Sequence, residues 1–237
     1  MSPEKSDTLL SLLNISVKAG GGSILENFSL DVSKGERLAL LGKNGSGKTT
    51  LLNIISGLKK PFSGRVSLEG QIGVVFQNPD SALFGSTVEE NLAFPLQSLS
   101  LPRSEIMERI QLFISRFELT GIRDRDILTL SGGQRQLVSL AAALISEPGL
   151  LLLDEPLSMI DRHDREVMLA TLSEIVSPET SVIFATNRFS EVQDFERFVL
   201  IGRQRKLFDG NSKELRESLS VFAEAEMTIP FEISVSC

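Results

Sequence analysis

The stretch GKNGSGKTT follows an apolar run and precedes a helical pattern, and its residues are of the types that bind phosphate. It fits the spacing G-x-x-x-x-G-K-[ST], in which glycines let the backbone curl so that successive N–H groups converge on phosphate oxygens. We therefore expect a phosphate-binding loop, with Lys48 on the β/γ-phosphates and Thr49 on Mg²⁺. The loop comprises Gly42, Lys43, Asn44, Gly45, Ser46, Gly47, Lys48, Thr49 and Thr50.

Two adjacent carboxylates end the apolar run LLLLDEP, residues 150–156. The carboxyl ends of buried parallel strands are where α/β sheets present their ligands. Asp154 is expected to hold Mg²⁺, directly or through water, and Glu155 to polarise an attacking water as a general base. Two acids that merely terminate a strand are the alternative, and the phosphate-binding loop favours the functional interpretation.

The heptapeptide LSGGQRQ, residues 130–136, precedes the helix-forming run LVSLAAALI. It matches the signature of ATP-binding-cassette (ABC) proteins, and with the other two motifs the chain resembles the ATPase subunit of an ABC transporter over residues 8–215. The resemblance implies ATP and Mg²⁺ as cofactors. It also implies a second ABC ATPase chain, in a homodimer or heterodimer, because in that family one chain's LSGGQ meets the nucleotide on the other chain's phosphate loop. The resemblance assigns nucleotide contacts to Ser131, Gly132, Gly133 and Gln134.

Other positions match the family one by one. Gln77, in VVFQNPD, resembles the glutamine that touches Mg²⁺ and water and senses an integral membrane subunit. Asp161, in LSMID, resembles the acid of the loop that crosses to the other protomer. The run NPDSALFGSTVEENLAFPL is similar to energy-coupling-factor importer ATPases. Within it, Leu83 and Phe84 either receive a helix of a membrane subunit or pack inside a helical subdomain.

The chain also departs from the family. Asn187 stands where the family usually has a histidine beside the γ-phosphate, and Ala19 stands where it has an aromatic ring on adenine. An asparagine amide donates a hydrogen bond but carries no proton or charge for catalysis, so hydrolysis at this chain's own site is expected to be slow. Two hypotheses stay open: a motor subunit with Glu155, Gln77 and Asn187 as catalytic residues, or a nucleotide-binding subunit that supports a different ATPase chain. A non-transport ABC protein is a third hypothesis.

The elements that must position these residues follow an α/β pattern. Unbroken apolar runs at 37–42, 150–156 and 181–186 predict parallel strands, and runs at 9–17, 26–32 and 64–76 predict strands of a β-rich N-terminal portion. Apolar residues at helical spacing after Ser104, the expected N-cap, predict a helix near 105–117. We predict one ABC-type P-loop NTPase domain over 1–237, with a mainly parallel core sheet, an antiparallel N-terminal portion, a helical subdomain at 78–133 and a tail at 216–237. That tail either has no assigned structure or forms one strand.

Composition limits the partners. A net charge of −7 and a pI near 5.0 argue against a nucleic-acid partner, which needs a cationic surface. The only cysteine is Cys237, so no intrachain disulfide is expected. No apolar run reaches the roughly 18 residues that span a bilayer. The N-terminal residues lack signal-peptide features. We expect a cytoplasmic protein, peripheral on the inner face of the cell membrane.

Overall fold

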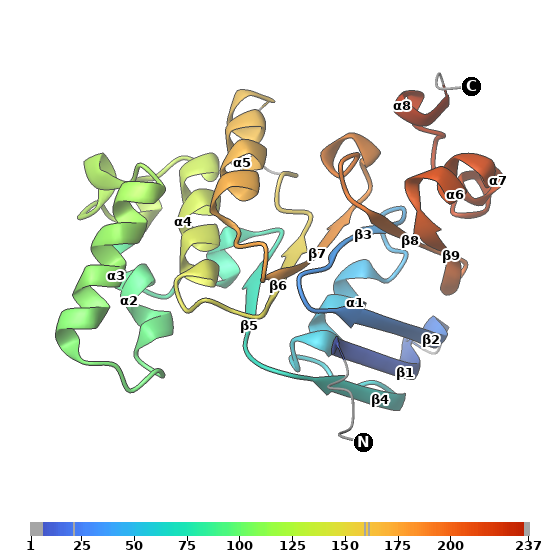
Figure 1. Ribbon diagram of the computed structural model, residues 1–237, viewed down its shortest axis with the longest axis horizontal. Coiled ribbons are helices and arrows are strands. Elements are labelled where there is room, and N and C mark those ends of the chain that lie inside the picture. The colour runs from blue at the N-terminus through green and yellow to red at the C-terminus, as the bar shows by residue number, and fades with distance from the viewer. Residues whose placement is uncertain (1–6, 21, 159, 161, 235–237) are drawn as a thin grey trace. The chain divides into compact units, whose positions relative to one another are not determined.

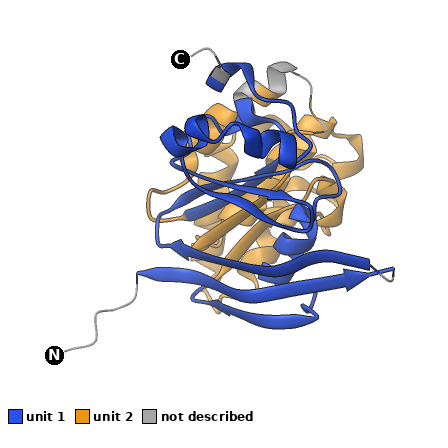
Figure 2. Cartoon of the chain, turned by 90° about the vertical axis from the view of Figure 1, so that its right-hand side faces the viewer, with its two compact units in different colours: residues 1–70, 181–237 blue, residues 71–180 orange. Residues whose placement is uncertain are grey.

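The computed structural model describes residues 7–20, 22–158, 160 and 162–234. The chain forms two compact units, coloured separately in Figure 2. Unit 1 combines residues 1–70 with 181–237, and unit 2 consists of residues 71–180. The prediction of a single domain with a helical subdomain at 78–133 stays a prediction.

The N-terminal part of unit 1 is an antiparallel sheet in which the strands lie in the order β2-β1-β4 (Figure 1). Along much of β1 and β2, buried apolar residues alternate with more exposed residues that are mostly polar, as expected for a sheet with one solvated face. The strands are β1 Thr8–Ala19, β2 Gly22–Ser33 and β4 Ser63–Leu68.

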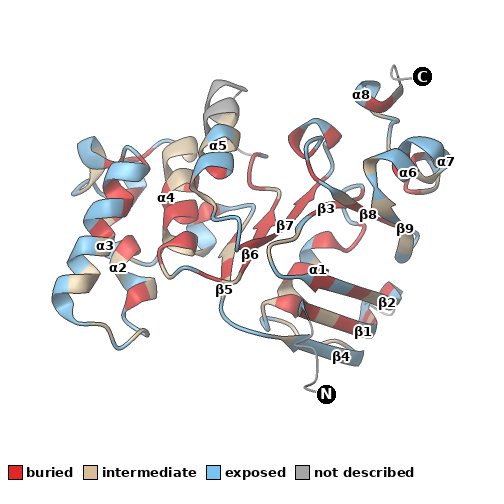
Figure 3. Ribbon diagram, in the orientation of Figure 1, coloured by how far each residue is buried: buried red, intermediate tan, exposed pale blue. Residues whose placement is uncertain are grey.

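A second group of strands in unit 1 lies in the order β7-β3-β8-β9. Strand β3 pairs in parallel with both β7 and β8, and β9 pairs antiparallel with β8. Nearly every residue of β3, β7 and β8 is buried (Figure 3), which explains their unbroken apolar sequences. These strands are β3 Arg37–Leu41, β7 Ser181–Thr186, β8 Arg197–Gly202 and β9 Arg205–Asn211.

The turn between β8 and β9 has two residues, Arg203 and Gln204. Both have positive φ, the two-residue turn geometry that matches the twist of the paired strands.

The helices of unit 1 are short. The helices are α1 Lys48–Ile55, the 3₁₀ turn η4 Phe189–Glu191, α6 Ser212–Glu217, α7 Ser220–Glu224 and α8 Phe231–Ser234.

Unit 2 contains one parallel strand pair, β5 with β6, and four α-helices within the described residues (Figure 1). Helix α4 packs against β5 and against α2, and strand β6 is buried at all five positions. The elements are β5 Ile72–Val75, η1 Pro79–Ser81, α2 Val88–Leu96, α3 Arg103–Arg116, η2 Thr120–Ile122, η3 Ile127–Thr129, α4 Gly132–Leu144, β6 Leu150–Asp154 and α5 Arg162–Ile175.

Three sequence predictions were wrong. Residues 72–75 do not join the N-terminal antiparallel sheet but pair in parallel with β6. Ser104 lies inside α3, because Pro102 is the N-cap and its extended backbone starts the helix earlier. The tail forms no strand at 231–234; a short helix starts directly after Pro230, since proline is well tolerated at a helix start. The hairpin β8–β9 was not anticipated.

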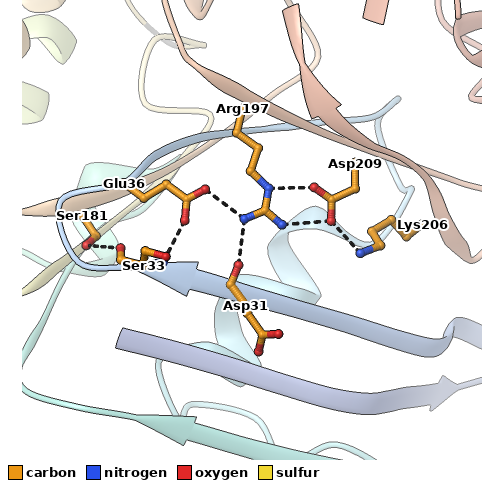
Figure 4. Close-up of polar contacts among 7 residues, drawn as sticks. All are labelled: Asp31, Ser33, Glu36, Ser181, Arg197, Lys206 and Asp209. Carbon is orange, nitrogen blue, oxygen red and sulfur yellow. Dashed lines mark hydrogen bonds and ion pairs between the residues drawn. The ribbon is translucent and has the colours of Figure 1, made fainter. Parts of the chain in front are cut away.

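A cluster of charged side chains in unit 1 joins the turn before β3 to the hairpin β8–β9 (Figure 4). Arg197 makes two parallel hydrogen bonds to Asp209, of 2.7 and 3.0 Å, and donates to Glu36 at 2.9 Å. The same guanidinium donates to the Asp31 carbonyl, and Lys206 donates to Asp209. Burial by itself raises the pKa of Asp209, but the hydrogen bonds from Arg197 and Lys206 outweigh it and hold that pKa below its usual value.

Replacing Arg197 with methionine is predicted to lower the free energy of unfolding by about 2–4 kcal/mol at pH 7, because two partly buried carboxylates, Asp209 and Glu36, lose the arginine that they share. The lowered pKa of Asp209 gives stability that is present above the unfolded-state value, about 3.9, and is lost as pH falls through the folded-state value. The difference from wild type should therefore shrink below pH 4 in denaturant titrations.

The matched control is Arg65→Met, at an exposed position of β4, which should change the free energy by no more than about 0.5 kcal/mol. An Arg197→Met deficit that stays constant from pH 7 to pH 3.5 would contradict the role given to the Asp209 carboxylate.

Candidate functional site

The predicted phosphate-binding loop lies in unit 1 between β3 and α1. Gly45 and Gly47 have φ of +79° and +106°, a backbone conformation that glycine adopts without strain. Gly42 has no room for a side chain: a Cβ there would lie 2.4 Å from Ser46 Oγ and 2.8 Å from the Ile201 carbonyl oxygen. The loop therefore folds tightly, as the backbone of a phosphate-binding loop must.

Lys48 begins α1 and is only 4% exposed. Its Nζ donates to the carbonyl of Gly42 at 2.8 Å and to that of Lys43 at 3.2 Å. The ammonium group is thus held across the mouth of the loop by the loop's own backbone. No side chain caps the start of α1, so its first N–H groups and the positive end of its dipole point at the loop.

Asn187 follows β7 and contacts the loop directly. Its Nδ2 donates to Asn44 Oδ1 at 2.8 Å. The turn that carries Asn187 is fixed by Thr186, whose hydroxyl donates to the buried Glu191 at 2.6 Å and accepts from the Arg188 N–H. The residue that stands in the histidine position therefore lies against the phosphate-binding loop.

The tail also reaches the loop. Lys43 Nζ donates to Glu226 at 2.5 Å, and this hydrogen bond and the charge of Lys43 lower the pKa of Glu226. Glu226 has positive φ just after α7, and the tail packs closely there, because a Cβ on Gly202 would meet Ala225 Cα at 2.8 Å. Glu226 is a contact that the sequence does not reveal, because it lies 183 residues from Lys43 and no motif marks it.

The two carboxylates lie in unit 2 at the end of β6. Asp154 is 4% exposed, and Glu155 has φ of +45°, a left-handed conformation that is costly for a residue with a side chain. Gln77 lies two residues beyond the end of β5, and its Nε2 donates to Glu155 Oε2 at 3.5 Å. Two neighbouring parallel strands thus bring Gln77 and Glu155 together, as α/β sheets do with ligand-binding residues.

The signature motif starts α4. Ser131 is the N-cap, and its hydroxyl accepts from the Gln134 N–H, while the Gln134 side chain accepts from the Ser131 N–H, each at 3.1 Å. Gln134 is therefore engaged in capping the helix. The Ser131 hydroxyl can still donate, and the N–H groups of Gly132 and Gly133 belong to the first turn, which has no acceptors within the helix.

Several predicted residues remain to be placed. Thr49 and Thr50 lie in the first turn of α1, while Asp161 lies outside the described residues. The predicted Mg²⁺ ligands Thr49, Gln77 and Asp154 supply hydroxyl, amide and carboxylate oxygens, which are hard donors of the kind Mg²⁺ prefers.

No helix in the described ranges is both long and apolar enough to cross a membrane.

A strand, a left-handed glycine loop, a buried lysine and a helix start in this order define a P-loop nucleotide-binding protein. The sequence model of the ABC transporter family matches residues 25–158, more than half of the chain. The chain therefore belongs to the ABC transporter family, as its ATP-binding component, and the fold prediction is confirmed. ATP hydrolysis is the activity that this membership supports.

Individual relatives are also named as ATP-binding proteins of ABC transporters or as parts of such transporters. A putative ABC transporter ATP-binding protein of Nostoc sp. is 33% identical over 232 residues, covering 90% of this chain and 85% of the relative. The energy-coupling factor transporter ATP-binding protein EcfA of Methanosarcina acetivorans is 33% identical, covering 90% and 83%. The solved structure of CbiO1 from Clostridium perfringens, described as part of the ABC transporter complex CbiONQ, has a TM-score of 0.79, 27% identity, and coverage of 97% and 99%.

Neutralising Glu226 is predicted to tighten Mg-ATP binding. Glu226→Gln removes a negative charge that Lys43 now pairs with, beside the loop that binds phosphate. We expect the Kd for Mg-ATP, measured by calorimetry at low salt, to fall by about two- to fivefold, and the effect to shrink as salt rises. Glu217→Gln, an equal charge change on the exposed face of α6, is the control. Equal effects of both variants would show a net-charge effect only.

Proposed function

We propose that this chain is the ATP-binding and ATP-hydrolysing subunit of an energy-coupling-factor type importer, peripheral on the inner face of the cell membrane. The observation that carries the proposal is the combination of three motifs in one chain with 33% identity to an energy-coupling factor transporter ATP-binding protein over 90% of the chain. The likeness to CbiO1, part of an ABC transporter complex, also supports it. The chain's net charge of −7 disfavours a nucleic-acid partner.

Binding of ATP is proposed to rest on the phosphate loop. Loop N–H groups and the start of α1 receive the phosphate oxygens, and Lys48 moves from the loop carbonyls to the β- and γ-phosphates. Thr49, Asp154 and Gln77 are the residues that would hold Mg²⁺. When bound, Mg²⁺ supplies neutralisation of charge on the phosphates. Glu155 takes the proton of the attacking water, oriented by the hydrogen bond from Gln77.

A second ABC ATPase chain is proposed as the immediate partner. The Ser131 hydroxyl and the first N–H groups of α4 form a donor cluster suited to a γ-phosphate that another chain holds. Asp161 is proposed to lie in the loop that contacts the same partner. The sequence is compatible with a homodimer and with a heterodimer.

A membrane subunit is the second proposed partner, and the loop before α2 is the proposed contact. Phe84 is 70% exposed and Phe94 52% exposed, and their rings lie 5.4 Å apart, while Leu83 is half-buried. Buried Asn91 holds this loop by bonding both the N–H and the carbonyl of Gly85. An exposed aromatic pair, with one ring from this fixed loop and the other from α2, suits an apolar helix of a membrane subunit.

Glu155→Gln tests the function. We expect purified protein to hydrolyse ATP with a turnover that rises with protein concentration, and the variant to lose about 10²-fold or more of kcat while still binding Mg-ATP, since glutamine cannot accept the proton. The control is Glu179→Gln, an exposed acid of the same unit. ATP binding without turnover in wild type would favour the alternative, in which this chain supports a second, different ATPase chain. Turnover unchanged in Glu155→Gln would contradict the catalytic role.

Asn187 is proposed to make this chain's own site slow. Its amide already lies on the phosphate loop, so a side chain at 187 is well placed to act on a bound phosphate. Asn187→His is expected to raise kcat on the order of tenfold with little change in KM, because imidazole can carry a proton. Asn187→Ala, which also breaks the bond to Asn44 but adds no imidazole, should give no rise. A histidine variant no faster than wild type would show that position 187 does not limit hydrolysis.

A further inference from the structure

Two consecutive residues of α4 bind the segment that carries Gln77. Gln136 Nε2 donates to the Phe76 carbonyl at 3.2 Å, and Arg135 forms an ion pair with Asp80, with 3.1 Å between Nε and Oδ1 but without the angle of a hydrogen bond. Phe76 directly precedes Gln77, and Asp80 follows it by three residues. The segment 76–80 is therefore attached to α4 at both ends, on either side of Gln77.

The same guanidinium reaches back to the signature motif. Arg135 Nη1 donates to the Leu130 carbonyl at 2.7 Å, and Leu130 directly precedes the N-cap Ser131. Arg135 thus joins Asp80 on one side to the start of the signature on the other. Asn78 keeps Asp80 in place, because its side chain accepts from the Asp80 N–H and caps the 3₁₀ turn η1.

Placing Gln136 at this buried position costs free energy. It is 2% exposed, and in the described part of the chain its Oε1 finds no hydrogen-bond partner. A buried acceptor without a partner costs free energy that an apolar side chain of similar size would not. The Gln136 amide nitrogen donates to the Phe76 carbonyl, a contact that an apolar side chain could not make, so holding this segment accounts for an amide at this position.

We propose that Arg135 and Gln136 are positioning residues that make the signature start and the Gln77 segment move as one body. The proposal rests on the proposed function for its catalytic consequence, since Gln77 in turn contacts Glu155. A displacement at Ser131, where a second chain's phosphate is proposed to bind, then reaches Gln77 and Glu155 through two side chains of one helix turn.

The test uses the full-length chain with Asp80→Asn, Arg135→Met and the double variant, and hydrogen exchange as the first readout. The pair is partly exposed, with 26% of the Arg135 side chain and 55% of Asp80 accessible, so its loss should leave folding intact. Each single variant should speed amide exchange at both 76–81 and 130–135. The matched control is Glu105→Gln, which breaks the Arg109–Glu105 pair on α3, also 3.1 Å long with a 26% exposed arginine.

Steady-state kinetics give the second readout. Each single variant should lower kcat about three- to tenfold with KM for ATP changed less than about twofold, and the double variant should be no worse than the poorer single one, because both break the same link. Arg135→Lys, which keeps the charge but cannot fork to both acceptors, should be intermediate. Gln136→Met should reproduce the exchange pattern.

Exchange that rises only at the mutated segment, or kcat losses that multiply in the double variant, would overturn the link. The exchange result decides this whether or not the purified chain hydrolyses ATP. An inactive wild type with coupled exchange would therefore count against the proposed function alone.

Discussion

A buried ammonium group must be given oxygen acceptors, and much of unit 1 depends on how Lys48 meets that requirement. Taking such a charge out of water costs several kcal/mol unless it is well bonded. Here the acceptors are carbonyls of the loop itself, so the loop has to wrap around its own lysine. That path is open only because Gly42 leaves space beside Ile201, and it starts from β3, which is held between two buried parallel neighbours.

In unit 2, two parallel strands hold Glu155 and Gln77 in place. Strand β6 is buried throughout, and the free energy of that burial supports a left-handed Glu155 at its end, a conformation that costs about 1–3 kcal/mol. Its parallel neighbour β5 ends just before Gln77, which bonds to the same carboxylate. In both units the apolar strands fix the backbone, and the residues of chemical interest occupy the first few positions after it.

How far the sequence predicts this molecule depends on the range of the signal. Motifs with local spacing, such as the loop at 42–50 and the signature at 130–136, are visible because their residues are close in sequence. The fold class follows from apolar strand runs and was correct. The pairing of residues 72–75 with β6 was not predicted, because the apolar pattern of a strand does not indicate which other strand it pairs with. Contacts such as Lys43 with Glu226 depend on tertiary packing and leave no pattern in the chain.

The junction of Gly202 with Ala225 brings the C-terminal segment against the strand that flanks the phosphate loop, and Glu226 completes the contact. This arrangement matters for handling the protein. A bulky affinity tag placed shortly after residue 226 sits near the nucleotide end of unit 1, so tags belong at the other terminus.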